Sequence, residues 1–392
     1  MRPTKCFLKT TKTCSVSNTS TIEMPRLWPH IVIGSFLLLS CSKMKDENVV
    51  LSDNSNKNIP GFAPPAHFPK PVYDFSGNTI DQKKFRLGRM LFYDPILSLD
   101  SCISCGTCHQ QSVAFTHLNH TVSHGINGLP GSRNSPTLAN LAWSPQLMWD
   151  GGIPNLEIQP LAPIENHVEM GDKLPNVLRK LNRHPLYSTR FKEAFQKDSI
   201  DSQQMLKALA QFMVMLVSGN SKYDHYLQGK ATLSNDELEG LKIVKEKCAS
   251  CHAGELFTDF AYHNIGLDSN ILDISDLGRE TVTKRKQDRR KFKTPSLRNM
   301  AVTKPYMHDG RTNDLKTCIK NHGEFDSPNL DSQLKKYIGT GIAISDEECM
   351  KVNAFINTLT DPTLLTDTLF SLRTTDFLPY STKPAKHCDY VH

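Results

Sequence analysis

Two short motifs constrain this 392-residue chain more than any other feature, because each places three reactive side chains within five residues. They are Cys105-Gly-Thr-Cys108-His109 and Cys248-Ala-Ser-Cys251-His252. Two cysteines on one helical turn can add to the vinyl groups at a porphyrin edge, and the adjacent imidazole then reaches the iron. For a lone Cys-x-x-Cys, a zinc site, a redox dithiol or a disulfide pair is an alternative. The pair of motifs predicts two covalent c-type haems, with His109 and His252 as iron ligands.

The sequence around these motifs is repeated once. In each copy a helical pattern leads into the motif and Phe-Thr follows it, at residues 105–116 and 248–258. We therefore predict a mainly α-helical protein with two cytochrome c-like domains, at residues 62–230 and 231–375, and a C-terminal tail at 376–392. Cys102-Ile-Ser-Cys105 has the same cysteine spacing but is followed by Gly106, so Cys102 is predicted to be a stray thiol that binds no haem.

Helical periodicity recurs along the chain, and no run alternates convincingly at the period of a strand. Capping boxes predict helix starts at residues 79–82, 234–237 and 345–348. A further helix is expected where Met205, Leu209, Phe212, Met213 and Leu216 recur at helical spacing.

The N-terminal region is typical of an export signal. Residues 31–39 form the one strongly apolar run, which is too short for a membrane-spanning helix of about 20 residues. Leu38-Leu39-Ser40-Cys41 resembles a lipoprotein cleavage site. We expect a signal peptide at 1–40, with Met24 as an alternative start, a lipid anchor on Cys41 and a flexible tether at 41–61. A plain cleaved signal is the alternative, and both predict an exported, periplasmic protein.

Charge gives no reason to expect nucleic-acid binding. Without residues 1–40 the formal net charge falls from +6 to +2, and the propionates of two haems would bring the protein near neutrality or below it.

Several longer phrases resemble one known family over residues 62–375. They are Leu87-Gly-Arg-Met-Leu-Phe-Tyr-Asp-Pro-Ile-Leu-Ser98, Arg133-Asn-Ser-Pro136, Met148-Trp-Asp-Gly151, Val168-Glu-Met-Gly171, Phe292-Lys-Thr-Pro-Ser-Leu-Arg-Asn299 and Pro305-Tyr-Met-His-Asp-Gly310. The family is that of the bacterial di-haem cytochrome c peroxidases, which includes the MauG-type enzymes. The resemblance implies that the first haem meets peroxide and that the second transfers electrons to it.

The resemblance also implies roles for four residues around the first haem. Glu169 is expected to move a proton between the peroxide oxygens, and Gln159 to position the peroxide. Trp149 is expected between the two haems. His124 is expected to cap the first iron in the oxidised state, although His117 and His120 lie close enough in sequence to leave the assignment open. A His-x-x-His metal site is the competing interpretation of these histidines.

Two further ligand sets follow from the resemblance. Asn134, Thr303 and Pro305 match an interdomain Ca²⁺ site of side-chain and carbonyl oxygens. The sixth ligand of the second iron lies about 14 residues beyond His308, where peroxidases of the family have Met and MauG-type proteins have Tyr. This chain has His322 there, so His252 and His322 are the expected pair, with Met307 as the alternative.

The expected activity is reduction of hydrogen peroxide with electrons from a small cytochrome c or cupredoxin. The alternatives are MauG-like oxidation of a protein or organic substrate and simple electron transfer by a di-haem carrier. Cys318 and Cys349 could pair in an oxidising compartment, whereas Cys388 has no evident partner. The resemblance is also compatible with a homodimer.

Overall fold

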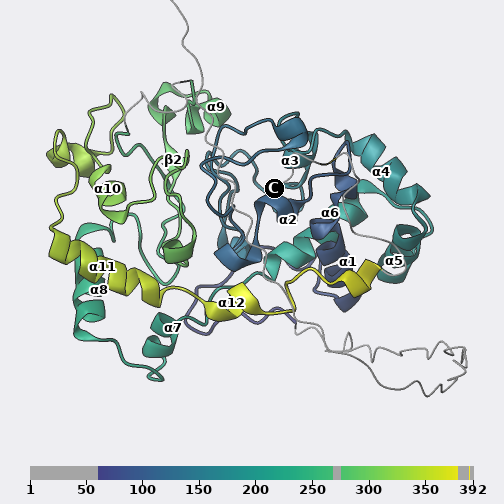
Figure 1. Ribbon diagram of the computed structural model, residues 1–392, viewed down its shortest axis with the longest axis horizontal. Helices are drawn as coiled ribbons and strands as arrows, with labels where there is room; N and C mark the ends of the chain where they lie inside the picture. Colours follow the sequence, from purple (N-terminus) through teal and green to yellow (C-terminus); the bar gives the residue numbers. More distant parts are fainter. Residues whose placement is uncertain (1–60, 268–274, 378–387, 389–392) are drawn as a thin grey trace, which may run out of the picture. The chain divides into compact units, whose positions relative to one another are not determined.

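The computed structural model describes residues 61–267, 275–377 and 388, and all of them belong to one compact unit. The predicted signal peptide, the Cys41 anchor and nearly all of the tether lie outside these residues. The helices are α1 Gln82–Tyr93, α2 Cys105–Cys108, α3 Leu161–Glu165, α4 Leu174–Arg183, α5 Pro185–Phe195, α6 Ser202–Val214, α7 Lys222–Leu227, α8 Asn235–Lys247, α9 Arg279–Thr283, α10 Leu315–Lys320, α11 Asp346–Thr358 and α12 Pro362–Thr366 (Figure 1).

The prediction of a mainly helical protein is confirmed. Strands β1, Tyr262–His263, and β2, Phe292–Lys293, pair antiparallel with Tyr262 opposite Lys293. Within residues 61–267 and 275–377, no helix is both long enough and apolar enough to cross a bilayer.

Two of the three expected capping boxes are confirmed. Ser234 opens α8 and Ser345 opens α11, each paired with the glutamate three residues later. The third was wrong, because α1 begins after Asp81, whose Oδ1 accepts the backbone N–H groups of Lys83 and Lys84 at 2.9 and 3.0 Å. The hydroxyl of Thr79 instead donates to the carbonyl of Phe75. A carboxylate at the N-cap satisfies the same free N–H groups as a hydroxyl would.

The same helix crossing occurs in both halves of the chain. A Cβ on Gly88 of α1 would lie 1.9 Å from the Ala208 carbonyl oxygen of α6, and one on Gly240 of α8 would lie 2.0 Å from that of Lys351 of α11. Only glycine allows the two backbones to approach this closely. Figure 1 shows α8 and α11 side by side. The structural repeat is therefore longer than the sequence repeat around the cysteine motifs.

A second pair of equivalent residues lies after the motifs. Asn140 and Asn299 both have φ of 62°, in the left-handed region, and each precedes a short 3₁₀ helix. Their amide nitrogens both donate to Ser218, from Asn140 to the carbonyl oxygen at 3.1 Å and from Asn299 to the hydroxyl at 2.9 Å. The two halves thus meet at one buried serine.

The chain after α11 returns to the N-terminal half. Leu364, Phe370 and Phe377 are buried in the same apolar core as α1 and α6. Arg89 of α1, which is 2% exposed, binds the carboxylate of Asp376 at 2.6 Å. The domain boundaries stay predictions, but residues 362–377 pack with the first half rather than with α8 and α11.

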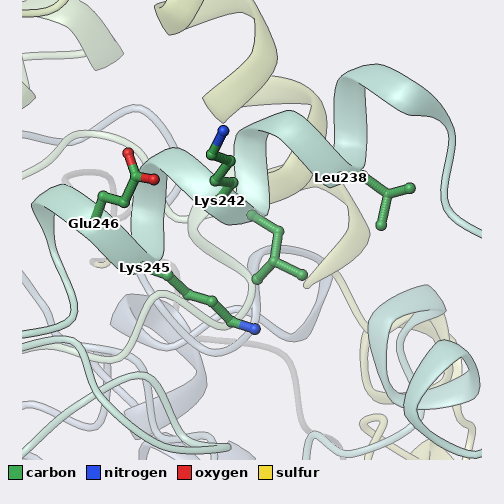
Figure 2. Close-up of a pocket in the computed structure, with 5 residues that line it drawn as sticks. Leu238, Lys242, Lys245 and Glu246 are labelled. Carbon is green, nitrogen blue, oxygen red and sulfur yellow. The ribbon is translucent and has the colours of Figure 1, made fainter.

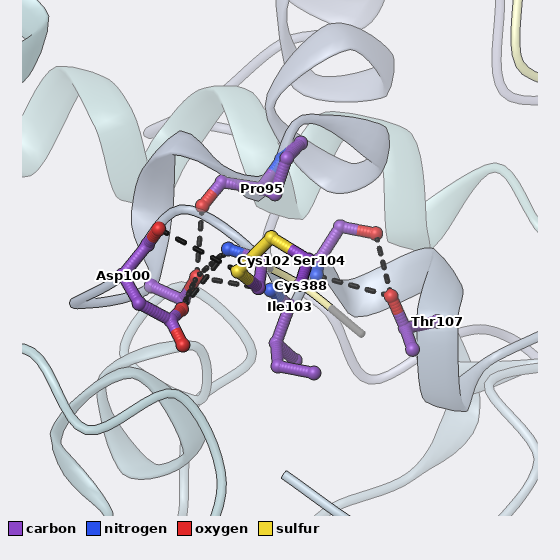
Figure 3. Close-up of a disulfide and its surroundings, with 8 residues drawn as sticks. Pro95, Asp100, Cys102, Ile103, Ser104, Thr107 and Cys388 are labelled. Atoms are coloured by element: carbon purple, nitrogen blue, oxygen red, sulfur yellow. Dashed lines mark hydrogen bonds between the residues drawn. A yellow bond between two sulfur atoms is a disulfide. The ribbon is translucent and has the colours of Figure 1, made fainter. Parts of the chain in front are cut away.

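The cysteine predictions need correction. Cys102 is not a stray thiol and Cys388 does have a partner, because the two form a disulfide with Cα atoms 5.4 Å apart (Figure 3). Cys318 and Cys349, whose pairing the sequence left open, are both unpaired thiols. Cys318 is buried on α10 and close enough to Cys248 to interact electrostatically with it. Proximity in the fold, and not spacing in the sequence, decides which cysteines pair.

Candidate functional site

The first Cys-x-x-Cys-His motif lies on one short helical turn. The backbone N–H of Ser104 donates to the Thr107 hydroxyl at 3.1 Å, which closes the start of α2. Cys105 and Cys108 occupy this turn as half-buried, unpaired thiols. His109 ends it, and its Nδ1 lies 2.8 Å from the carbonyl oxygen of Phe115. Because a carbonyl can only accept, Nδ1 carries the proton and Nε2 keeps the lone pair that a metal ion needs.

The second motif repeats this arrangement at the end of α8. The backbone N–H of His252 donates to the Cys248 carbonyl at 2.9 Å, which continues the helical turn. Nδ1 of His252 lies 3.3 Å from the Phe257 carbonyl oxygen, the counterpart of Phe115. Burial lowers the pKa of His252 to about 4. The imidazole is therefore neutral near pH 7, as an iron ligand must be.

The chemistry of the four cysteines fits covalently bound haem better than the alternatives. Burial raises the pKa of Cys105 to about 12 and those of Cys108 and Cys248 to about 11. Redox-active dithiols have a lowered thiol pKa, so that interpretation is disfavoured. None of the four is in a disulfide. Among the described residues, the group whose ligand atoms lie close together is Cys251, Asp259 and His263, which takes only one cysteine of a pair.

The structure brings Glu169 to the first motif. Its carboxyl is partly buried, and it is close enough to Cys105 and Cys108 to contribute to their raised pKa values. Burial raises the pKa of Glu169, while the hydrogen bond from Asn166 Nδ2 to Oε1, 2.7 Å long, lowers it. The backbone carbonyl of Glu169 accepts the N–H of Ile126 at 2.7 Å. A carboxyl group with a raised pKa therefore lies beside the two cysteines of the first motif.

Gln159 contacts Met148, the residue that precedes Trp149. Nε2 of Gln159 is 3.8 Å from the Met148 sulfur. The Trp149 indole N–H donates to the Asn134 carbonyl at 2.8 Å, and the Trp149 carbonyl accepts the backbone N–H of Lys293 at 2.8 Å. Trp149 is thus held both from its own half and from β2.

The three candidate capping histidines differ in burial. His117 is 4% exposed and stacks on His120 with 3.9 Å between ring centroids, whereas His124 is exposed. Nδ1 of His117 lies 2.8 Å from the Ser123 hydroxyl, and burial lowers its pKa to about 4. His117 also interacts electrostatically with His109. Which of these residues caps the first iron stays a prediction, and burial favours His117 over His124.

His322 lies close to His252. It follows α10, and its Nδ1 is 2.9 Å from the Cys318 carbonyl oxygen, which again leaves Nε2 with a lone pair. Burial lowers the pKa of His322, and His322 in turn contributes to the lowered pKa of His252. Met307, the alternative ligand, lies in the loop that carries His308, where its φ is 75°.

The predicted cation ligands start from a buried asparagine. Nδ2 of Asn134 donates to the carbonyls of His120 and Thr121 at 3.2 and 3.1 Å, so its Oδ1 points elsewhere and is the atom left for a cation. The Asn134 N–H donates to the His308 carbonyl at 2.8 Å. Thr303 and Pro305, which follows a cis peptide bond, come from the other half of the chain. The Ca²⁺ site stays a prediction.

Sequence reasoning missed an ion-pair network beside Trp149. Arg133 binds Asp276 through two nitrogens, both at 2.7 Å, and Asp150 through a third at 2.7 Å. Since Asp150 follows Trp149, this network fixes the tryptophan loop. Arg133 stands in one of the phrases quoted for the family, which is the signal that could have found it.

Sequence reasoning also missed a stacked pair in the second half. The rings of Phe292 and His308 lie 3.6 Å apart between centroids with 14° between their planes. Both line a cavity of about 320 Å³, together with Ser132, Asn264, Ile265, Leu267, Asp276, Arg290, Asp309, Arg311, Phe325, Asp326, Ser327 and Pro328. This cavity is next to the loop of Trp149, because Asp276 also belongs to the ion-pair network.

A second pocket carries none of the predicted site residues. It measures about 440 Å³ and lies on the surface of α8, lined by Leu238, Leu241, Lys242, Lys245 and Glu246. Figure 2 shows these side chains along successive turns of one helix, with Lys242 and Glu246 above it and Lys245 below it, so their polar ends do not converge. We therefore exclude it from the candidate site.

Comparison with known proteins agrees with this geometry. A family model described as di-haem cytochrome c peroxidase matches residues 82–232. The methylamine utilization protein MauG of Methylorubrum extorquens is 32% identical over 345 residues, which cover 85% of this chain and 93% of that protein. The cytochrome c551 peroxidase of Nitrosomonas europaea is 35% identical over 277 residues, 70% of this chain and 79% of that protein.

The solved structures include a MauG-like protein associated with microbial copper homeostasis. It superposes with a TM-score of 0.70 at 31% identity and covers 81% of this chain and 98% of its own. Together with the two cysteine motifs and the relatives above, this likeness shows that the chain belongs to the di-haem cytochrome c peroxidase family, which includes the MauG proteins.

Proposed function

We propose that this protein reduces hydrogen peroxide to water beside its first Cys-x-x-Cys-His motif, with electrons entering through the second. The observation that carries the proposal is the partly buried carboxyl of Glu169, which lies next to Cys105 and Cys108 and has a raised pKa. The two haems of the family would supply the iron and the redox equivalents when bound. A pure electron carrier needs no proton-transferring group at this place.

Glu169 is suited to move one proton during cleavage of the O–O bond. Asn166 occupies Oε1, so Oε2 is the oxygen left for the substrate. The carboxylate takes the proton from one peroxide oxygen and returns it to the other, which then leaves as water. Burial favours the neutral acid, and this brings the pKa of Glu169 closer to the working pH. The full reaction consumes two electrons and two further protons for each peroxide.

Gln159 and Trp149 complete the proposed site. The Gln159 amide has a donor available for a peroxide oxygen, since Nε2 is engaged by the Met148 sulfur, which is only a weak acceptor, at 3.8 Å. Trp149 is held rigidly by Asn134 and Lys293 and offers a large π-system for electron transfer between the halves. A small periplasmic cytochrome c or cupredoxin is the proposed donor.

The ligands proposed for the second iron are His252 and His322. Both imidazoles are neutral and have Nδ1 engaged by a backbone carbonyl. A second imidazole donates more strongly than a thioether, so we expect a lower reduction potential than methionine ligation would give. The exported, lipid-anchored location, the Ca²⁺ ion at Asn134, Thr303 and Pro305, and a homodimer are further parts of this proposal.

MauG-like oxidation of a protein or organic substrate is the second candidate. It is favoured by the coverage of the Methylorubrum MauG, of which this chain matches 93%. It is weakened by His322, because the resemblance places tyrosine at that position in MauG-type proteins.

Turnover with reduced cytochrome c separates these functions. The protein with both haems is mixed with hydrogen peroxide and a reduced small cytochrome c, and oxidation of the cytochrome is followed by absorbance. A peroxidase oxidises two cytochromes for each peroxide consumed. A MauG-like oxidase would leave the cytochrome reduced and would consume peroxide only when an organic substrate is added to supply the two electrons. An electron carrier would consume no peroxide.

A further inference from the structure

A buried disulfide lies beside the first Cys-x-x-Cys-His motif. Cys102 is three residues before Cys105, and it is bonded to Cys388, 286 residues later in the sequence (Figure 3). Cys102 is 2% exposed and Cys388 is 8% exposed. Because both ends are buried, small thiols and protein reductants have little access to the bond. The disulfide is therefore a lasting link and not a rapidly exchanging switch.

The loop that carries Cys102 leads directly into the haem-binding turn and is tightly hydrogen-bonded. The Ser98 hydroxyl oxygen accepts the backbone N–H groups of Cys102 and Ile103, both at 3.1 Å. Oδ1 of Asp100 accepts the Cys102 N–H as well, at 3.0 Å. Figure 3 shows these bonds around the backbone of Cys102, next to the disulfide. A displacement of Cys102 would therefore move the whole loop, residues 98–104, and with it the start of α2.

The opposite side of this loop is tied to the segment that carries Glu169. The Leu99 N–H donates to the carbonyl of Met170, the residue after Glu169, at 2.9 Å. Nζ of Lys180 donates to the Ser98 carbonyl at 2.6 Å and pairs with the Asp172 carboxylate at 2.8 Å. Loop 98–104 thus has Cys105 at one end and the Glu169 segment along its side.

We propose that the Cys102–Cys388 disulfide is a positioning element of the peroxide site, which holds loop 98–104 so that the Glu169 carboxyl keeps its place beside Cys105 and Cys108. The proposal rests on the function proposed above. Formation of the bond removes two electrons and two protons from the two thiols. These pass to a disulfide-donating oxidoreductase of the exported compartment, whose own disulfide becomes a dithiol.

The other anchors of the C-terminal segment act elsewhere. Asp376 binds Arg89, and the Phe370 carbonyl accepts the hydroxyl of Tyr93 at 2.8 Å, so these two contacts are on α1. The Gln111 amide also donates to the carbonyls of Leu364 and Asp367, at 3.0 and 2.9 Å. They hold residues 362–377 to the first half without touching loop 98–104. The disulfide adds the connection to the loop itself, which is why its effect on Glu169 can be separated from a general effect on stability.

The test uses Cys102→Ser as its main variant, because it breaks the disulfide and leaves the freed thiol on Cys388 and not three residues before Cys105. The variant is purified with both haems, which is checked by mass spectrometry, and kcat/KM for hydrogen peroxide is measured against pH. We expect a loss of about tenfold, as small displacements of a catalytic group produce. We also expect a shift in the midpoint of the limb of the kcat/KM–pH profile that reports the ionisation of Glu169. Cys388→Ser should behave identically.

Two further variants keep the test decisive. Lys180→Met retains the disulfide but removes the hydrogen bond from Lys180 to the Ser98 carbonyl, the second contact that holds the loop. It should change the pH profile in the same direction as Cys102→Ser. Asp376→Asn loosens the C-terminal segment on α1, and it should lower the melting temperature while leaving the pH profile unchanged.

If Cys102→Ser and Lys180→Met retain the wild-type profile, the disulfide is only a structural link and the proposal is wrong. A difference between Cys102→Ser and Cys388→Ser would overturn it too, since the effect would then come from the free thiol. An inactive wild-type protein would instead refute the proposed function.

Discussion

The two Cys-x-x-Cys-His motifs have the same surrounding framework, but a different residue lies near each motif. Each histidine donates Nδ1–H to a carbonyl five or six residues later, and each half has a glycine at the helix crossing and a left-handed asparagine. Beyond these shared parts, Glu169 lies near the first motif and His322 near the second. An acid beside one iron and an imidazole beside the other would make the first reactive and the second an electron store. In the proposed function, the repeat would supply His109 and His252 as iron ligands, and one added residue, Glu169 or His322, would decide the role of each iron.

The halves also differ in how they are anchored. The phrases Pro136-Thr-Leu-Ala-Asn140 and Pro295-Ser-Leu-Arg-Asn299 are equivalent, and they place Arg298 where the first half has Ala139. Arg298 is fully buried and binds both oxygens of Asp224 on α7, at 2.8 and 3.0 Å. The second half is therefore attached to the connecting segment by a buried ion pair that the first half lacks at this position.

The largest expected effect is that of Glu169→Gln. The amide cannot exchange a proton, so kcat/KM for hydrogen peroxide should fall by about 10²- to 10⁴-fold, the range for general acid–base catalysis. Stopped-flow mixing with peroxide measures it. Glu165→Gln, at the exposed end of α3, is the matched control and should keep wild-type activity. Equal kcat/KM values for Glu169→Gln and Glu165→Gln would contradict the proposed role of Glu169 at the first motif.

Asp224→Asn should be the most destabilising of the substitutions considered. It leaves Arg298 buried without its counter-charge, which costs about 3–5 kcal/mol of unfolding free energy. Chemical denaturation at pH 7 measures the loss, and Asp198→Asn, in an exposed pair with Lys192, should leave the unfolding free energy nearly unchanged. Similar losses for the two variants would contradict the anchoring role.

The pH dependence of that loss follows from the pKa of Asp224. Burial raises it, but the bonds from Arg298 and Ser221 outweigh burial and lower the pKa to about 2. The stabilisation is therefore complete above the unfolded value of about 4 and is lost as the pH falls through about 2. The difference between wild type and Asp224→Asn should shrink over that range.

His322→Met should raise the reduction potential of the second haem. A thioether favours ferrous iron, and the expected change is on the order of 0.1 V, a part of the range that axial ligands span. A redox titration followed by absorbance measures it. His308→Phe keeps the stack on Phe292 and should leave the potential nearly unchanged. No change in His322→Met would mean that another residue binds the second iron.

The smallest effect is expected from Asn166→Leu. Burial raises the pKa of Glu169 and the Asn166 hydrogen bond opposes this, so loss of the bond should raise the pKa further. Because the carboxylate must be deprotonated to take the first proton, the acidic limb of the kcat/KM profile should move to higher pH. A shift to lower pH would contradict the assignment of that limb to Glu169.

Local signals predicted much of this molecule. The capping boxes at Ser234 and Ser345 specify helix starts through contacts three residues apart, and the structure confirms both. The cysteine motifs likewise depend on one helical turn. The start of α1 was missed because Thr79 and Asp81 are both able to cap, and only the tertiary structure shows which does.

Contacts between distant segments could not be predicted. The disulfide joins residues 286 positions apart, and the buried pair of Arg298 with Asp224 joins residues whose sequence contexts give no sign of each other. The burial of His117 and the exposure of His124 also depend on how the loop folds back. The family resemblance predicted that Glu169 belongs near the first motif and His322 near the second. It did not predict their hydrogen-bond partners, the Asn166 amide and the Cys318 carbonyl.

Binding of cyanide to the half-reduced protein tests the central claim most directly. Electron spin resonance distinguishes the two irons, and the number of bound ligands is counted against covalent haem measured by mass spectrometry. The account predicts two haems for each chain and one bound cyanide, at the iron next to Glu169, with the iron between His252 and His322 unchanged. Fewer than two haems, cyanide at both irons, or no cyanide at either would contradict it.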